Sequence, residues 1–160
     1  MTDGGSSITE VQRLLAVLAA GKCCAELGTA FGEGAEAIAT TAASLVTTEL
    51  DPGRARIARE RLAGLANVEF LEGDWRETLP PRGPFGLVFL DAGGWKDDPY
   101  GKGQLALDLL EPGGLLVKDD MTPNPGRDPV REWLFGHPQL VATEILTTRE
   151  TAAIVAARRP

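Results

Sequence analysis

Residues 23–40 read CCAELGTAFGEGAEAIAT, and this stretch decides the fold. It begins as an apolar strand, passes through a glycine-rich turn and continues in an alanine-rich pattern typical of a helix. Glu26 stands two residues before Gly28, the first glycine of the turn. A strand, a glycine turn and a helix start in this order are typical of an α/β sheet that binds a small molecule at its strand ends.

Strands and helices alternate along the rest of the chain. Ser7 and Glu10 have the S-x-x-E spacing of a capping box at the start of the first helix. The tail contains two β-rich runs joined by a short turn, which predicts an antiparallel hairpin. Strands are predicted over 22–27, 44–49, 68–71, 86–91, 115–119, 139–148 and 151–159, and helices over 8–18, 34–43, 51–65, 105–110 and 129–134.

This alternation predicts a single α/β domain over residues 1–160, with residues 1–7 as a disordered tail. The expected fold is a Rossmann-like, doubly wound and mostly parallel sheet of about seven strands, with the hairpin as its C-terminal antiparallel element.

Composition limits the partners. Hydrophobic residues make up 43% of the 160 residues and the net charge is −7, so the chain lacks the basic surface typical of nucleic-acid binding. No apolar run approaches the roughly 20 residues that span a bilayer, and the first residues do not resemble a signal peptide. A small-molecule partner, no nucleic acid, no membrane and a cytoplasmic location are therefore expected. Cys23, Cys24 and the single histidine, His137, have no zinc-site spacing.

Acidic side chains follow every predicted parallel strand. Ligands of such sheets bind beyond the carboxyl ends of the strands. A row of carboxylates at one rim costs electrostatic repulsion, which suggests a ligand that uses it. The residues are Glu26 after the first strand, Glu49 and Asp51 after the second, Asp74 after the third, Asp91 after the fourth, and Asp119 with Asp120 after the fifth.

Two kinds of cofactor compete for this rim. Dinucleotide sites use G-x-G-x-x-G, but Ala30 stands at the second glycine position. Glu49 could accept both hydroxyls of a ribose, which either cofactor carries. Glu26 would repel a pyrophosphate and suits a cationic group, such as the ammonium of S-adenosylmethionine, although it could also cap a helix. A dinucleotide-dependent oxidoreductase remains the alternative, without a Tyr-x-x-x-Lys pair to support it.

The stretches AELGTAFGEGAEAIAT, LVTTELDP, FLEGDW, FGLVFLDA and LLEPGGLLVKDD together resemble class I S-adenosylmethionine-dependent methyltransferases over residues 22–120. Many members have glycine at the position of Ala30. O-methyltransferases accept a larger residue there, and within the family the resemblance is to the catechol and caffeoyl-CoA-like O-methyltransferases. It implies S-adenosylmethionine as cofactor, S-adenosylhomocysteine as product and a small hydroxylated acceptor. The implied cofactor-binding residues are Glu26, Gly28, Thr29, Ala30, Gly32, Glu49, Leu50, Gly73, Asp74, Trp75 and Asp91.

In that group a divalent metal is held by an Asp after the fourth strand and an Asp-Asn pair after the fifth. Asp91, Asp119 and Asp120 match these positions, with Asp120 in place of Asn, and oxygen ligands suit Mg²⁺. The segment WKDDPY is similar to the group's W-K-D, which implies Lys96 as a catalytic base beside Asp91. The plainer readings are that Asp119 and Asp120 cap a loop and that Lys96 is solvated.

Only about 20 residues precede the first strand, whereas the group places several helices there. The substrate pocket is then either open or completed by a second copy in a homodimer. A protein that binds an adenosyl ligand without catalysis is the remaining alternative. Trp95 could face the substrate or anchor a loop, and Trp75 could be an adenine shelf or core.

Overall fold

A computed structural model describes residues 7–123 and 126–160. The expected disordered tail lies outside the described residues, except for Ser7, which is buried. In the described part of the chain, no helix is long and apolar enough to cross a membrane.

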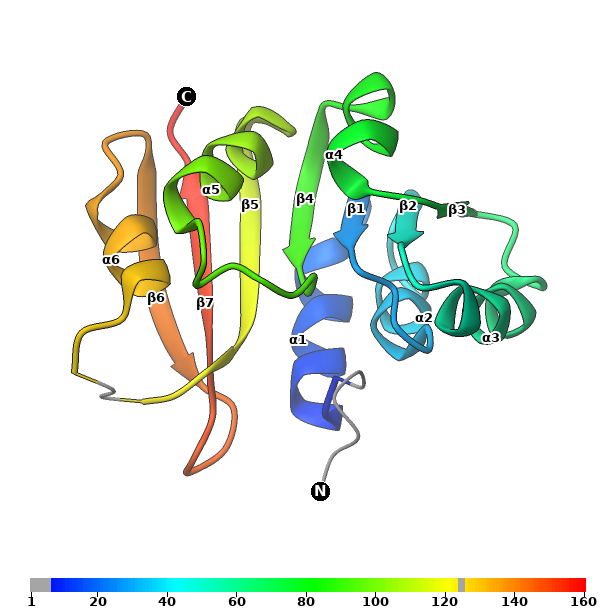
Figure 1. The fold of residues 1–160 in the computed structure, drawn as a ribbon, viewed down its shortest axis with the longest axis horizontal. Coiled ribbons are helices and arrows are strands. Elements are labelled where there is room, and N and C mark those ends of the chain that lie inside the picture. Colours follow the sequence, from blue (N-terminus) through cyan, green and yellow to red (C-terminus); the bar gives the residue numbers. More distant parts are fainter. Residues whose placement is uncertain (1–6, 124–125) are drawn as a thin grey trace.

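The described residues form a seven-stranded sheet in the order β3-β2-β1-β4-β5-β7-β6 (Figure 1). β7 runs antiparallel to both of its neighbours, and the other pairings between neighbouring strands are parallel. The predicted fold class is therefore confirmed. The strands are β1 (Cys23–Leu27), β2 (Ser44–Glu49), β3 (Val68–Glu72), β4 (Phe85–Leu90), β5 (Leu110–Met121), β6 (Leu140–Leu146) and β7 (Ala152–Arg158).

Helices cover both faces of the sheet, as a doubly wound sheet requires. One face packs against α1 (Thr9–Ala19), α2 (Glu33–Ala39) and α3 (Pro52–Leu62). The other packs against α4 (Trp75–Thr78), α5 (Pro99–Asp108) and α6 (Pro129–Gly136), and a 3-10 turn, η1 (Pro80–Arg82), follows α4. All six residues of β4 are buried between these layers, which explains its continuous apolar sequence.

Two local predictions were wrong and one short helix was missed. The N-cap of α1 is Ile8, and the Ser7 side chain makes no capping hydrogen bond. The helix predicted over 105–110 begins earlier, at Pro99, because the Asp98 side chain caps the helix by accepting a hydrogen bond from Gly101 N. The helix also ends before Leu110, which already belongs to β5. The short helix α4 was not predicted, although Asp74 caps it in the same way.

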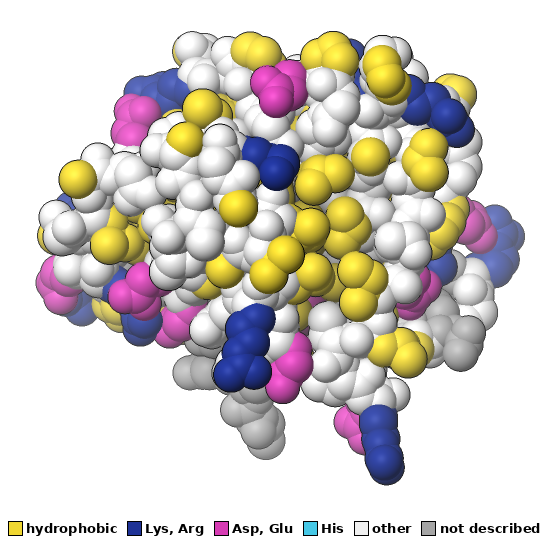
Figure 2. Space-filling model, turned by 180° about the vertical axis from the view of Figure 1, so that it is seen from behind, with side chains coloured by type: hydrophobic (Ala, Val, Ile, Leu, Met, Phe, Trp, Pro, Cys, Tyr) yellow, Lys and Arg dark blue, Asp and Glu magenta, His cyan; other side chains and the backbone are white. Residues whose placement is uncertain are grey.

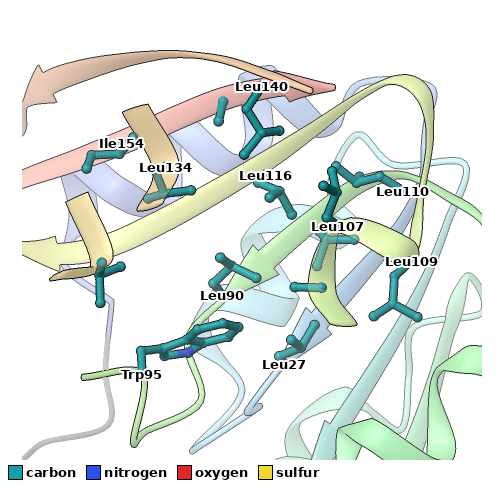
Figure 3. Packing of buried hydrophobic residues seen from close by; sticks show 14 of the residues in the cluster. Leu27, Leu90, Trp95, Leu107, Leu109, Leu110, Leu116, Leu134, Leu140 and Ile154 are labelled. Carbon is teal, nitrogen blue, oxygen red and sulfur yellow. The ribbon is translucent and has the colours of Figure 1, made fainter. Parts of the chain in front are cut away.

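Leucines from β1, β4, β5, α5 and α6 form the larger core cluster (Figure 3). At its edge α5 packs against α6 through Gly103, where an added Cβ would lie 2.6 Å from a ring carbon of Trp133. Gly103 is therefore the position at which the Trp133 ring lies directly against the helix backbone.

Gly103→Ala is expected to lower the free energy of unfolding by about 1–3 kcal/mol, the usual cost of overpacking a core. Gly136→Ala is the matched control, because it is also helical and an added Cβ there would meet nothing within 4 Å. Urea unfolding of both variants measures the difference, and equal stabilities would contradict the packing account.

The edge strand β6 leaves several of its hydrophobic side chains exposed. Val141 pairs with Ala157, which pairs with Leu115, so these side chains share the face on which α1 packs. Val141 and Ile145 of the edge strand β6 are exposed. Figure 2 views the molecule from the back of Figure 1 and shows this face, with hydrophobic side chains gathered near its middle.

Candidate cofactor cleft

A cleft of about 810 Å³ opens at the carboxyl ends of the parallel strands, where sheets of this kind bind ligands. Most of the predicted cofactor residues line it, but Glu26, Thr29 and Gly32 do not. The predicted residues in its lining are Gly28, Ala30, Glu49, Leu50, Gly73, Asp74, Trp75, Asp91, Asp119 and Asp120.

Glu49, the last residue of β2, is held by two backbone amides. Its Oε2 accepts a hydrogen bond from Ala30 N at 2.8 Å and its Oε1 from Asp51 N at 2.9 Å. The side chain is almost fully buried yet borders the cleft. Each carboxylate oxygen has a second lone pair, so this fixed group can accept the two hydroxyls of a ribose.

The turn after β1 passes directly against the segment after β4. Gly28 has a φ of +93°, and an added Cβ would lie 2.9 Å from both N and Cα of Ala92. Ala30 also adopts a left-handed φ of 50°, and this conformation aims its N–H at Glu49. The turn therefore needs glycine at position 28, while alanine at position 30 is accommodated.

Glu26 lies behind the turn rather than at the cleft surface. It is fully buried, and its Oε2 accepts a hydrogen bond from Thr47 Oγ1 at 2.6 Å, while Thr47 Oγ1 also contacts Thr29 Oγ1 at 2.6 Å. Burial raises the pKa of Glu26 well above its usual value, and the nearby Asp91 raises it further. Glu26 does not cap a helix, because the N-cap of α2 is Gly32 and no side chain makes a capping hydrogen bond there.

Trp75 and the ion pair between Asp74 and Arg76 line the cleft beyond β3. The Asp74 carboxylate accepts hydrogen bonds from Arg76 Nε at 3.0 Å to each oxygen, and these hydrogen bonds lower the pKa of Asp74. Trp75 stacks on Trp95, with ring centroids 5.9 Å apart and an angle of 18°. Both rings are buried, so Trp95 is a loop anchor, and Trp75 belongs to both the core and the cleft wall.

The predicted metal ligands all border the cleft but do not form a metal site. Within residues 7–123 and 126–160, no group of three or more His, Cys, Asp or Glu side chains could hold a metal ion. Asp119 is buried and Asp120 is exposed, with a left-handed φ of 58°. The ammonium of Lys118 interacts electrostatically with both and with Asp91, so a cation from the chain already offsets their charge. The residues do not fit the metal hypothesis.

Asp91 itself has unusual acid–base properties. Burial raises its pKa to about 7, and Asp119 and Asp120 add to this effect, while Lys118 opposes it. Such a group can take up and release a proton within the cleft.

Lys96 is exposed and is not among the residues that line the cleft. Lys102 of α5 lines it instead and donates a hydrogen bond to Gly94 O at 2.6 Å. The sequence contained a signal for this, because Asp98 and Pro99 are the N-cap and first position of α5, which places Lys102 in its first turn. The other cleft residues that the sequence reasoning missed are Ser7, Thr48, Pro52, Arg54, Arg76, Ala92 and Gly93, whereas Asp51 lines the cleft as the rim of carboxylates predicted.

Several known proteins are similar to this chain in sequence or in structure. Protein-L-isoaspartate O-methyltransferase from Methanoculleus marisnigri is 35% identical over 94 residues, which make up 58% of this chain and 40% of that protein. The O-methyltransferase TomG from Streptomyces achromogenes, solved with S-adenosylmethionine, is 26% identical with a TM-score of 0.78, over 100% of this chain and 84% of TomG. Cofactor-bound Rv0187 from MTB is 27% identical with a TM-score of 0.80, over 96% of this chain and 82% of Rv0187.

The family comparison covers the part of the chain that builds the cleft. Residues 25–121, more than half of the chain, match the model of a methyltransferase domain. This range runs from β1 to the end of β5 and contains Gly28, Glu49 and Asp91. The resemblance read from the sequence is confirmed, and the chain belongs to the methyltransferase domain family.

Proposed function

We propose that this chain transfers the methyl group of S-adenosylmethionine to a hydroxyl group of a small molecule and releases S-adenosylhomocysteine. The observation that carries the proposal is the Glu49 carboxylate, which Ala30 N and Asp51 N hold at the edge of the cleft, with a second lone pair on each oxygen to accept a ribose hydroxyl. The likeness to TomG, an O-methyltransferase solved with S-adenosylmethionine, supports both the cofactor and the oxygen acceptor.

In this proposal the cofactor lies along the strand ends. The backbone at Gly28 approaches its amino-acid end, Glu49 accepts the ribose hydroxyls, and Asp74 with Trp75 borders the adenine. The sulfonium is already a good leaving group, so the protein mainly aligns the acceptor oxygen, the methyl group and the sulfur. A cleft of about 810 Å³ has room for such a cofactor and a small acceptor.

Asp91 is the proposed base. Its pKa of about 7 allows it to accept the hydroxyl proton of the acceptor as the oxygen attacks the methyl carbon. No step of this proposal uses a metal ion, because the three aspartates do not form a site for one. A base role for Lys96, a homodimer, the lack of a nucleic-acid partner and a cytoplasmic location stay predictions.

Calorimetric titration of S-adenosylhomocysteine tests the proposal. We expect binding to the wild type, a loss of about 1–3 kcal/mol in Glu49→Ala for hydrogen bonds to a charged group, and no change in Glu150→Ala, which removes an exposed carboxylate from the hairpin turn.

Other outcomes of that titration separate the alternatives. Binding of NAD or NADP in place of S-adenosylhomocysteine would favour the oxidoreductase, and the absence of binding by any of the three would indicate a scaffold without a cofactor. Methyl transfer to a hydroxylated aromatic compound would exclude a protein that only binds an adenosyl ligand.

A further inference from the structure

The edge strand β6 lacks the features that usually protect an exposed sheet edge. In the sheet that the described residues form, β6 pairs only with β7, so no strand lies on its outer side (Figure 1). Edge strands commonly carry lysine, proline or a bulge, which prevent pairing with another chain. The sequence of β6 is LVATEIL, without lysine or proline, and its register with β7 is unbroken from Leu140 to Leu146. The outer side of β6 is therefore able to pair.

The hydrogen bonds to β7 determine which backbone groups of β6 face outward. Arg159 N donates to Gln139 O at 2.8 Å and Thr147 N donates to Thr151 O at 3.0 Å, one at each end of the pairing. Hydrogen-bonded pairs recur at every second residue of an antiparallel ladder, so the odd-numbered residues of β6 bond to β7. The even-numbered residues of β6 therefore direct their N–H and C=O groups away from the sheet.

This pattern fits a second copy of the same strand. Thr143 is the central residue of β6. When two β6 strands pair antiparallel about a two-fold axis at Thr143, Ala142 of one copy lies opposite the partner's Glu144, and the symmetric pair is identical. Both residues direct their backbone groups outward, so each pair can exchange two hydrogen bonds. Such a contact uses the same surface on both copies and closes as a dimer.

The apolar side chains on the α1 side of the sheet also match in this register. Val141 lies opposite the partner's Ile145 in a non-hydrogen-bonded pair, the kind in which cross-strand side chains are closest. Val141 is 54% exposed and Ile145 is 38% exposed in the single chain. Their contact therefore removes apolar surface from water on both sides of the axis.

The charges of β6 do not oppose this pairing. Glu144 is the one charged residue in the sequence of β6, and its carboxylate forms an ion pair with the Arg131 guanidinium of α6 at 2.7 Å. Across the axis it lies opposite the partner's Ala142, so no like charges are directly opposed. The net charge of −7 on each copy acts over longer distances, and physiological salt screens it beyond about 8 Å.

We propose that β6 is a self-association surface, through which two copies of this chain form a homodimer with one continuous sheet. Among the described residues that line the cofactor cleft, none belongs to β6 or β7. This dimer therefore leaves both clefts open and does not complete the substrate pocket. The inference is independent of the reaction that the cleft performs.

Sedimentation equilibrium of the full chain at physiological salt tests the proposal. The mass of the wild type is expected to rise with concentration to twice that of one chain. Val141→Lys combined with Ile145→Lys should raise the Kd of the dimer about a hundredfold or more, because lysines would face each other across the axis. The matched control, Val17→Lys combined with Ile57→Lys, places the same charges on exposed positions of α1 and α3 and should leave the Kd unchanged.

A mixture of two charged variants tests the register. Val141→Glu combined with Ile145→Glu should also be monomeric by itself. An equal mixture of the double glutamate and double lysine variants should form a dimer again, because each lysine then faces a glutamate. Thermal unfolding of every variant checks that it is folded.

Three results would overturn the inference. A wild type that stays monomeric at every concentration would leave the β6 edge free for an extended peptide of another protein. A dimer that the double lysine variant retains would use a different surface. Charged variants that do not associate when mixed would show that the strands do not pair in this register. Titration of S-adenosylhomocysteine is a separate measurement, so none of these results decides the proposed function.

Discussion

Gly28→Ala is expected to abolish measurable binding of S-adenosylhomocysteine and to lower the melting temperature. The added Cβ would lie 2.9 Å from N and Cα of Ala92, and both atoms belong to the backbone and cannot rotate away. Position 28 also has a φ of +93°, which an L side chain rarely adopts. Relief of the clash has to move the turn after β1 or the segment after β4, and both line the cleft.

Gly21→Ala separates the effect of the backbone clash from the effect of the positive φ. Gly21 has a similar positive φ of +69°, but an added Cβ there would meet nothing within 4 Å. It should therefore lose only the roughly 1–2 kcal/mol of the left-handed conformation and bind the ligand normally. Melting curves and titrations of both variants measure this, and normal binding by Gly28→Ala would show that the close approach has no role in the site.

Asp91→Asn is expected to stabilise the protein at pH 8 and to reduce the proposed methyl transfer by about 10²–10⁴-fold, the usual contribution of a general base. The pKa of Asp91 is raised from 3.8 to about 7, so the folded state binds more protons than the unfolded state between these values. Stability therefore falls as pH rises through this window and is lower by a few kcal/mol above pH 7. Asparagine carries no charge and avoids that loss.

Urea unfolding at pH 5 and pH 8 measures the effect. The stability gained by Asp91→Asn over the wild type should be larger at pH 8 than at pH 5. Asp97→Asn, which removes an exposed carboxylate from the same loop, should show no such difference between the two pH values. A gain that is equal at both pH values would show that burial does not raise the pKa of Asp91.

The order of strands and helices could be predicted because hydrophobic periodicity and glycine or proline breakers are local signals. The predicted strands correspond to β1–β7, and the parallel topology places Glu49 and Asp91 at one rim of the sheet. Helix ends were less accurate where a cap was overlooked, as at Asp98, or wrongly assigned, as at Ser7. These errors moved boundaries without changing the fold.

The sequence by itself determined the fold class and the cofactor rim, because these depend on periodicity and strand direction. Only the tertiary structure decided that Glu26 lies buried behind the turn, that Lys118 stands among the aspartates of the expected metal site, and that Lys102 rather than Lys96 borders the cleft. The physical reason is that side-chain direction and the separation of residues distant in sequence depend on how loops and helices pack. Ser7 shows this most clearly, since its place beside Gly34 follows from the docking of α1 against α2, which no local pattern encodes.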